Sequence, residues 1–466
     1  MAARITVHGH FYQPPRENPW TGDIEVQPGA APYRDWNARV HAESYRPNTR
    51  VELADGRVVN NFEKLSFDVG PTLLEWMKEA DPPTYAAILG ADHGNAIAQA
   101  YHHTILPLSP ARDIRTQVRW GLRDFMHRFG RRSEGIWLPE TAADQRTIDV
   151  LIEEGVHFTI LAPGQAASDE PLDTTVPYRI AHSDGSERYV TVFFYDGAIS
   201  HAIAFDGAAA SAEGLTDLFE ARSSPGCHVA HSATDGETFG HHQKFSDIGL
   251  AYALFVEAPR RGLEVVDYSS FLAECPPERS VRLRPGGTSW SCAHGVGRWR
   301  EDCGCSTGGE EGWNQKWRGP LRRGLEVVRQ AADDVYERAG REVFTHPWGA
   351  RDRYVDVVCG AVTLDEFVAT ETVPDASAGR AANLLELQRN SMSMFTSCGW
   401  FFNDVGGIET VQVMLYAART MDLLERLGAS PPREQFLSLL DEAESNDAEL
   451  GSGAAIYERS VAAAKP

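Results

Sequence analysis

The sequence predicts an α/β protein that continues into a second, mainly helical part. Over roughly the first 270 residues, short apolar runs alternate with longer stretches of helical spacing, as they do in repeated β-α units. After Trp317 the apolar residues keep helical spacing to near the end of the chain. The β-α alternation is compatible with an α/β barrel and with a doubly wound sheet. In both folds the functional residues lie at the carboxyl ends of the strands.

Composition narrows the possible functions. The chain has 466 residues, of which 42% are hydrophobic, 24% charged and 10% aromatic. This balance excludes collagen-like, coiled-coil and broadly disordered proteins, and the length suggests roughly two or three domains. The 66 acidic and 44 basic residues give a formal net charge of −22, which repels phosphate backbones and anionic membranes. We therefore expect neither nucleic acid nor membrane as a partner, whereas a neutral sugar meets no such repulsion.

Cysteine usage and hydropathy predict a cytoplasmic protein. No apolar run approaches the roughly 18 residues of a membrane-spanning helix. The first residues enter a strand-like pattern without the apolar run of a secretory signal. The odd number of cysteines, seven, favours reduced thiols over a disulfide framework.

Apolar patterns predict the elements of the β-α part. Strands are expected at Arg4–Phe11, Gly135–Leu138, Val156–Ala162, Tyr189–Tyr195, His228–Thr234 and Glu264–Tyr268, and helices at Ala111–Phe129, Asp144–Glu154 and Gln243–Ala258. Asp144 is the expected N-cap of the second helix and Gly155 its expected stop. This helix, with the strands before and after it, predicts a right-handed β-α-β unit with parallel strands.

The later part is predicted from the same patterns. Helices are expected at Leu321–Arg338, Asn383–Thr396, Ile408–Leu427 and Arg433–Glu444, with a frayed tail beyond Gly451. Residues 276–317 are rich in Gly, Trp and Cys, which indicates a functional loop near the active site rather than a flexible linker. The predicted domains are therefore a catalytic part at 1–275, this loop region, and a helical domain at 318–466.

Two segments place polar groups at predicted strand ends. In His8-Gly9-His10-Phe11-Tyr12-Gln13-Pro14, the two histidines alternate along a strand and point to the same face. They are either a hydrogen-bonded structural pair or part of a site. In Gly135-Ile136-Trp137-Leu138-Pro139-Glu140, a carboxylate follows a hydrophobic strand, and Trp137 is a candidate platform for a sugar. A lone Glu at this position is also compatible with a helix-capping or surface role.

A third segment, Ala233-Thr234-Asp235-Gly236-Glu237-Thr238-Phe239-Gly240-His241-His242, follows a strand and precedes a helix. Its carboxylates and imidazoles are compatible with a metal site, with a general acid/base carboxylate whose histidines hold substrate hydroxyls, or with structural capping of the helix. The spacing matches no recognisable metal motif. Glu140 and Asp235, at two strand ends, are the pair of carboxylates that glycoside hydrolysis requires.

Together these segments resemble glycoside hydrolase family 57. The His-containing strand that runs into Gln13-Pro14 is similar to the family's first motif, and Trp137-Leu138-Pro139-Glu140 to its third. The fourth motif is matched by Asp235-Gly236-Glu237-Thr238-Phe239-Gly240-His241, and the second in outline by residues 94–108. The segment from Ser397 to Asp404 resembles a motif of the family's helical domain.

The resemblance implies an N-terminal (β/α)7 barrel, followed by the helical domain, and retaining chemistry on α-linked glucans without cofactor or metal. It assigns Glu140 as the nucleophile and Asp235 as the general acid/base. The carboxyl groups of these two residues should lie roughly 5–5.5 Å apart. The residues expected to bind substrate are His8, His10, Gln13, His93, Trp137, His241, Trp290, Trp400 and Asp404. The implied activity is hydrolysis or 4-α-glucan transfer.

Other interpretations remain open at this level. A metal-dependent carbohydrate deacetylase has a barrel of similar type and needs a metal on His and Asp residues. A non-catalytic glucan-binding protein would keep the fold, although it has no need of both Glu140 and Asp235. Four residues of the loop region, Cys292, His294, Cys303 and Cys305, are candidate zinc ligands. Because their spacing matches no common zinc module, a reduced, packed loop is the favoured interpretation.

Overall fold

The structure is a computed structural model that describes residues 2–168 and 170–466. The chain divides into two compact units. The first unit comprises Met1–Gln13, Val26–Ala100 and Phe125–Trp290, and the second comprises Pro14–Glu25, Tyr101–Asp124 and Ser291–Pro466. The division therefore differs from the predicted boundaries, since residues 14–25 and 101–124 join the later part of the chain.

The first unit contains the strands and the helices that connect them. Its strands are β1 (Ala3–Phe11), β2 (Val51–Glu52), β3 (Val58–Val59), β4 (Ser66–Val69), β5 (Ala98–Gln99), β6 (Ile136–Trp137), β7 (Phe158–Leu161), β8 (Ala166–Ala167), β9 (Tyr178–Ala181), β10 (Tyr189–Phe194), β11 (Val229–Asp235), β12 (Leu263–Val265), β13 (Arg279–Ser280) and β14 (Arg282–Leu283). Its helices are α1 (Trp36–Val40), α2 (Arg46–Asn48), α3 (Pro71–Ala80), α4 (Pro82–Gly90), α6 (Gln145–Glu153), α7 (Gly197–Phe205), α8 (Ala212–Glu220), α9 (Ser246–Tyr252), α10 (Ala258–Arg260) and α11 (Tyr268–Glu274).

Parallel pairing of the strands brings their carboxyl ends together. β1 pairs with β11 along its length and with β4 at its carboxyl end, so His10 lies between Asp235 and Asp68. Parallel bridges or ladders continue from β4 to β5, β6, β7 and β10. From Arg4 onward β1 is buried on both faces, as expected of a central parallel strand.

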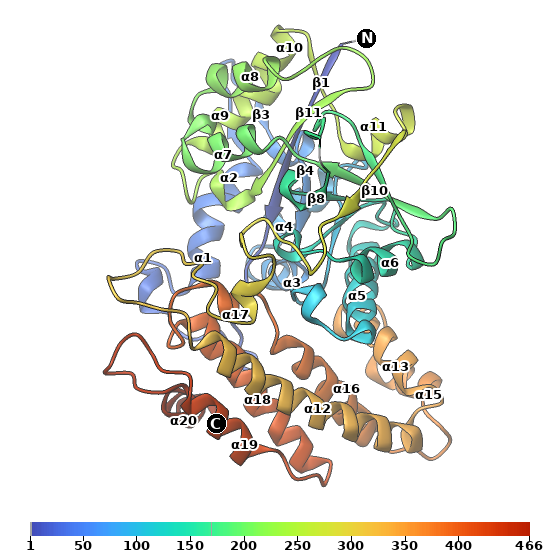
Figure 1. Ribbon diagram of the computed structural model, residues 1–466, viewed down its shortest axis with the longest axis vertical. Helices are drawn as coiled ribbons and strands as arrows, with labels where there is room; N and C mark the ends of the chain where they lie inside the picture. The colour runs from blue at the N-terminus through green and yellow to red at the C-terminus, as the bar shows by residue number, and fades with distance from the viewer. Residues whose placement is uncertain (1, 169) are drawn as a thin grey trace. The chain divides into compact units, whose positions relative to one another are not determined.

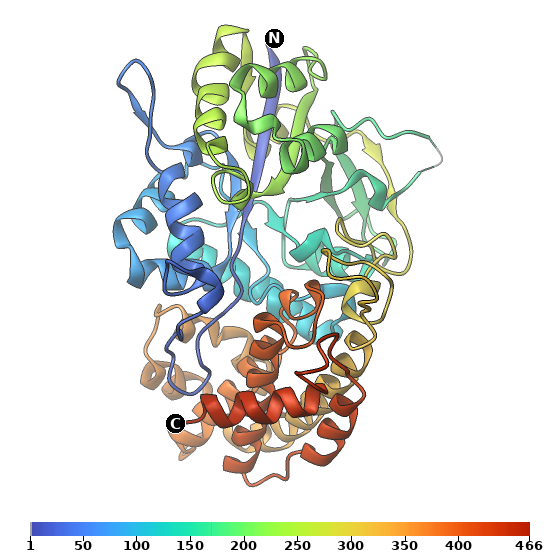
Figure 2. The same ribbon diagram turned by 90° about the vertical axis from the view of Figure 1, so that its left-hand side faces the viewer.

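The ring of strands is not closed by continuous pairing among the described residues. Between β10 and β11 the backbone is joined by a hydrogen bond from the amide of Asp196 to the carbonyl of His231, at 2.8 Å. Helices α7 and α8 contact β11, and Figure 2 shows them, in green, beside the long blue strand β1. The core beneath the strand ends is aromatic and aliphatic, and includes Trp137, Phe158 and Phe193.

Local sequence signals explain most boundaries in this unit. The side chain of Asp144 accepts a hydrogen bond from the amide of Thr147 at 2.8 Å, and Gly155 has a φ of 75°, which confirms the predicted start and stop of α6. The predicted strand Glu264–Tyr268 is wrong in its second half. Asp267 caps α11 there by accepting from the amide of Ser270, so Tyr268 begins a helix.

One pair of cysteines differs from the expectation of reduced thiols. Cys227 and Cys275 form a disulfide, and their Cα atoms lie 5.4 Å apart. The two residues are 48 positions apart in the sequence, so their pairing depends on how the chain between them folds. The cytoplasmic location stays a prediction.

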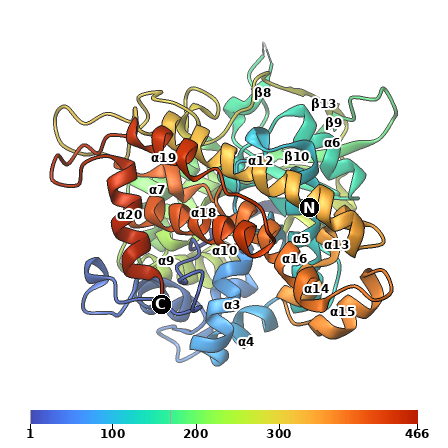
Figure 3. The ribbon, with the colours of Figure 1, turned by 90° about the horizontal axis from the view of Figure 1, so that it is seen from below.

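The second unit is helical (Figure 1). Its helices are α12 (Arg318–Val343), α13 (Pro347–Arg353), α14 (Val355–Val358), α15 (Leu364–Glu371), α16 (Ala378–Ser393), α17 (Cys398–Phe401), α18 (Ile408–Arg426), α19 (Arg433–Asp441) and α20 (Gly453–Ala464), and α5 (Ala111–Phe129) enters it up to Asp124. Helices α12, α16 and α18 pack side by side (Figure 3). Their core includes Trp120, Tyr336, Leu384 and Leu424.

The end of the chain corrects a prediction. Residues beyond Gly451 are not frayed, because α20 begins at a Ser452 cap and packs against α19. The rings of Phe436 and Tyr457, one from each helix, lie 5.1 Å apart. Among the described residues, we find no helix with the length and apolar character needed to cross a bilayer.

Candidate active site

Glu140 lies in a strained turn directly after β6. Its φ is 56° and that of Thr141 is 49°, in the left-handed region that residues other than glycine rarely adopt. Hydrogen bonds hold the turn: Thr141 donates to Gln165 Oε1 at 2.8 Å, and the Gln165 amide donates back to the Thr141 carbonyl at 2.8 Å. Backbone strain of this kind is kept only where the surroundings enforce it, and it is concentrated at functional sites.

Trp290 donates two hydrogen bonds to Glu140 in this turn. Its indole N–H donates to Glu140 Oε2 at 3.0 Å, and its backbone amide donates to the Glu140 carbonyl at 3.1 Å. The interaction orients one carboxylate oxygen and satisfies it with a neutral donor. The half-buried Trp290 is therefore placed against the predicted nucleophile, and its binding of substrate stays a prediction.

Asp68 organises the two histidines of β1. Its Oδ2 lies 2.8 Å from His10 Nδ1, and its Oδ1 lies 3.1 Å from His8 Nε2. His8 Nδ1 lies 3.1 Å from Ser66 Oγ, so both of its ring nitrogens are engaged inside the protein. Because His8 is fully buried, we assign it a positioning role in place of the predicted contact with substrate.

Trp137 is also part of the scaffold. Its ring stacks on His8 and on His10, with centroids 4.9 Å apart in each case, and meets Trp290 edge-on at 5.1 Å. No part of Trp137 is exposed, so it offers no face to a sugar, contrary to the expectation of a platform.

The close packing of the segment after β11 requires glycine at two positions. A Cβ on Gly236 would lie 2.3 Å from the ring of Phe11, and one on Gly240, whose φ is 109°, would lie 2.2 Å from the carbonyl oxygen of Glu43. Between them, Glu237 accepts from the amide of Tyr12 at 3.0 Å and from the hydroxyl of Tyr45 at 2.5 Å. These contacts tie the ends of β1 and β11 together and hold Asp235 at the edge of the strands.

The charges at this edge are strongly coupled. Asp235 is open to solvent on one side, yet protein atoms surround it on the others, and this loss of hydration raises its pKa. The positive charge of His10 opposes the rise, and the Asp68 carboxylate adds to it. Burial and the neighbouring Asp235 raise the pKa of Glu237 to about 7. Burial disfavours the charged form of His10, but Asp68 outweighs it and raises the pKa of His10 to about 9. Burial lowers the pKa of His8, so the two histidines differ in protonation.

Contacts link the two predicted catalytic residues into one site. The Trp290 ring beside Glu140 also lies 6.4 Å from the ring of His10 and 6.4 Å from that of Tyr195, just after β10. Both of these residues interact electrostatically with Asp235. The predicted separation of roughly 5–5.5 Å between the carboxyl groups stays a prediction.

Other predicted residues lie elsewhere or serve other contacts. His93 is exposed, precedes β5 and lies 3.0 Å from the Glu63 carbonyl, so it belongs to the amino end of the strands, away from the site. His241 Nδ1 lies 2.6 Å from Glu43 Oε2, and its contact with substrate stays a prediction. Gln13 is buried just beyond β1, where its carbonyl accepts from Thr72.

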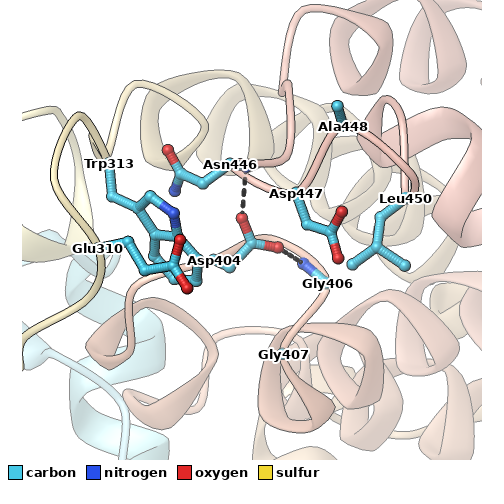
Figure 4. Close-up of a pocket in the computed structure, with 9 residues that line it drawn as sticks. All are labelled: Glu310, Trp313, Asp404, Gly406, Gly407, Asn446, Asp447, Ala448 and Leu450. Atoms are coloured by element: carbon cyan, nitrogen blue, oxygen red, sulfur yellow. Dashed lines mark hydrogen bonds between the residues drawn. The ribbon is translucent and has the colours of Figure 1, made fainter.

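The two predicted residues of the helical domain belong to the second unit. Trp400 is fully buried and donates to the Arg318 carbonyl, so it has no ring face for a sugar. Asp404 accepts from the amides of Gly406 and Asn446 and lines a pocket of about 510 Å³ in that unit (Figure 4). The expected contact of these two residues with the substrate stays a prediction.

Sequence reasoning missed three residues of the site. Asp68 and Tyr195 lie at the ends of β4 and β10, where polar residues following an apolar strand were the available signal. Gln99, at the end of β5, is buried, and its side-chain amide has no hydrogen-bond partner among the described residues. A buried amide without a partner is costly, which makes Gln99 a candidate ligand for a substrate hydroxyl.

Parallel strands whose carboxyl ends carry a strained Glu, a second carboxylate with a raised pKa and buried histidines define an enzyme that acts on glycosidic bonds. The comparison with known families agrees. Residues 28–284, more than half of the chain, match the family described as "Glycosyl hydrolase family 57", and the chain belongs to that family. Residues 313–465 match the family described as "Domain of unknown function (DUF3536)". No curated protein matches the sequence.

Solved structures of low sequence identity share the fold. An exo-type maltose-forming amylase from Pyrococcus sp. ST04 is 16% identical, with a TM-score of 0.73 over 94% of this chain and 82% of its own. A branching enzyme from Thermococcus kodakaraensis is 16% identical, with a TM-score of 0.60 over 98% and 96%. A 4-α-glucanotransferase from Thermococcus litoralis is 16% identical, with a TM-score of 0.56 over 91% and 60%.

The charge of His10 predicts a pH-dependent stability. Its pKa is about 9 in the folded protein and about 6.5 in an unfolded chain, so its stabilisation is complete below pH 6.5 and is lost as the pH rises to 9. Glu237, with a pKa of about 7, still titrates in the lower part of the window from pH 7 to 9, so the comparison with Asp68→Asn is what identifies the contribution of His10. There we expect the free energy of unfolding to fall by up to about 1.4 kcal/mol per pH unit, and by much less in Asp68→Asn.

Denaturant unfolding at several pH values measures this slope, and NMR titration of the imidazole measures the pKa directly. The matched control is Asp55→Asn, the same change at an exposed aspartate, which should keep the wild-type slope. An unchanged slope in Asp68→Asn would show that Asp68 does not hold the charge on His10.

Proposed function

We propose that the enzyme hydrolyses or transfers α-linked glucans by a retaining mechanism, with Glu140 as the nucleophile and Asp235 as the general acid/base. The observation that carries the proposal is the contrast between the two carboxyl groups. Glu140 accepts a hydrogen bond from the Trp290 indole, which an ionised carboxylate does well, whereas burial and Asp68 favour the protonated form of Asp235. Environments that differ in this way separate a nucleophile from an acid.

In the first step, Glu140 attacks the anomeric carbon while Asp235 donates its proton to the leaving oxygen. The bond to the leaving sugar breaks, and a glycosyl-enzyme ester forms. The imidazolium of His10, beside Asp235 in the strand register, supplies positive charge next to the acid as it becomes a carboxylate. Asp68 fixes the orientation of that imidazole.

In the second step, Asp235 accepts a proton from water or from a sugar hydroxyl, and the oxygen attacks the anomeric carbon and releases Glu140. Each step inverts the configuration at the anomeric carbon, so the two steps together retain it. Water as the acceptor gives hydrolysis, and a sugar hydroxyl gives transfer. The amylase, branching-enzyme and glucanotransferase activities of the structural relatives support a substrate of α-linked glucose for this chain.

The proposal includes the fold that aligns these residues. Strands β1, β4, β5, β6, β7, β10 and β11 would form the (β/α)7 barrel of the family within the first unit, which would be its catalytic part, and the second unit would be its helical domain. Gln99, His10 and Trp290 would then contact the sugar bound at Glu140. The unpartnered amide of Gln99 and the half-buried ring of Trp290 support these assignments.

Product analysis tests the mechanism. With maltooligosaccharides or an aryl α-maltoside, we expect the product first formed to be the α-anomer, because the two displacements restore the configuration. NMR during the first minutes, before mutarotation, measures it. A β-anomer would contradict the proposal. Chromatography of the same reaction separates the two activities, since transfer yields chains longer than the substrate and hydrolysis yields only shorter ones.

A further inference from the structure

The loop that follows Trp290 in the chain gathers four metal-ligating side chains in the second unit. Cys292, His294, Cys303 and Cys305, here called the Cys/His cluster, place their ligand atoms within 4.8 Å of one another. The described residues contain no other group of three or more Cys, His, Asp or Glu side chains arranged to hold a metal ion. The catalytic chemistry proposed above uses none of the four.

Three distances within the cluster match the edges of a tetrahedral site. Zinc binds thiolates at about 2.3 Å and imidazoles at about 2.0–2.1 Å, so its tetrahedron has S···S edges of about 3.8 Å and S···N edges of about 3.5 Å. The Sγ atom of Cys292 lies 3.8 Å from that of Cys303 and 3.8 Å from that of Cys305. Cys305 Sγ lies 3.5 Å from His294 Nδ1. These separations leave room for one ion at the centre.

The same distances exclude covalent pairing in this arrangement. A disulfide requires sulfurs about 2.05 Å apart, far closer than 3.8 Å. Three thiols that converge on an imidazole, with all four groups turned to one point, are the donor set of a Cys₃His zinc site.

The backbone is shaped to bring the ligands together. Gly304, between two of the cysteines, has a φ of 81°, which lets the chain turn between adjacent ligands. A Cβ on Gly297 would come within 3.1 Å of the Cys303 Cβ and 3.5 Å of the His294 Cβ, so the backbone passes close to two of the ligands at this glycine.

The second observation that supports a bound metal ion is the buried positive charge beside the Cys/His cluster. Arg318 is fully buried and donates to the carbonyls of Cys305 at 2.8 Å and Phe402 at 3.1 Å. Among the described residues it forms no ion pair with a carboxylate, and its Nε has no partner. Arg298, also buried, donates to the Phe401 carbonyl at 2.9 Å. Buried guanidinium groups need a compensating negative charge nearby.

We propose that Cys292, His294, Cys303 and Cys305 bind one Zn²⁺ ion in a structural site. Three thiolates and a neutral imidazole around a divalent ion carry a net charge of minus one, which compensates the buried Arg318. Four protein ligands fill the tetrahedron and leave no position for water or substrate, so the site is structural. It joins the two ends of the Cys292–Cys305 segment and replaces the packed, metal-free loop expected from the sequence.

The test measures metal content and does not depend on glycosidase activity. We expect the full chain, purified without chelator and incubated with Zn²⁺ before desalting, to retain one zinc ion per molecule by inductively coupled plasma mass spectrometry. The double variant Cys303→Ser/Cys305→Ser should lose nearly all of it. The matched control is Cys359→Ser, which changes a buried cysteine outside any disulfide, elsewhere in the second unit, and should keep the metal.

Two measurements on the wild-type chain cover the case in which the double variant does not fold. Blocking the thiols with a mercurial should release the zinc to an indicator dye. Replacing zinc with Co²⁺ should give the intense visible bands of a tetrahedral thiolate site. A wild-type chain that retains no zinc, a double variant that keeps it, or a disulfide between two of the cluster cysteines in non-reduced peptides would overturn the proposal.

Discussion

Replacing Glu140 with Gln is expected to abolish turnover of every glycoside, because no glycosyl-enzyme can form without the nucleophile. The expected fall in kcat is on the order of 10⁴–10⁶-fold, the range seen when a nucleophile is removed. It should be equally severe for an activated aryl α-glycoside and for a glucan, since a better leaving group does not replace the attacking carboxylate. Initial rates with both substrates measure the effect.

The matched control for this change is Glu79→Gln, the same substitution on the exposed face of α3, which should leave kcat unchanged. Because Glu140 lies in a strained turn, circular dichroism and thermal unfolding must show that the variant is folded. A folded Glu140→Gln variant with near-normal turnover would refute the assignment of the nucleophile.

Replacing Asp235 with Ala is expected to separate the two steps of the reaction. Loss of the acid should slow an unactivated glucan by about 10²–10⁴-fold, whereas an aryl α-glycoside with an acidic leaving group should still form the glycosyl-enzyme. The intermediate should then break down slowly for want of a base. Azide needs no deprotonation, so its addition should accelerate turnover and yield an α-glycosyl azide.

The configuration of the azide product is the internal control. In Glu140→Ala, azide can only displace the leaving group directly, which would give the β-glycosyl azide. NMR of the two products therefore identifies which carboxylate was removed. An Asp235→Ala variant that azide does not accelerate, or that yields the β-azide, would contradict the role of general acid/base.

Much of this protein was predictable because the deciding interactions are local. Helix α5 has the predicted bounds Ala111–Phe129, and β1 differs from its prediction by one residue, since apolar periodicity alone specifies both. The cap at Asp144 and the stop at Gly155 likewise depend on neighbouring residues. The candidate catalytic residues Glu140 and Asp235 were predictable because each lies at the end of a strand within a short motif.

Tertiary structure decided the roles of the residues around them. Trp137 and Trp400 were predicted to offer a ring face to a sugar, yet both are fully buried. Whether a ring is buried depends on which distant parts of the chain pack over it. Asp68 became part of the site only through the pairing of β4 with β1, which places it between two histidines nearly sixty residues earlier. No local pattern encodes such pairing.

The sequence by itself determined the elements, the strand-end carboxylates and the family resemblance, because periodicity, capping and short motifs act over a few residues. Only the tertiary structure decided that Trp290 holds Glu140, that Cys227 pairs with Cys275, and that four residues spread over the Cys292–Cys305 segment converge on one point. Contacts between residues far apart in the chain depend on how the intervening segments fold. The sequence shows which side-chain types are present, whereas the distances between them and their pKa values depend on the folded chain.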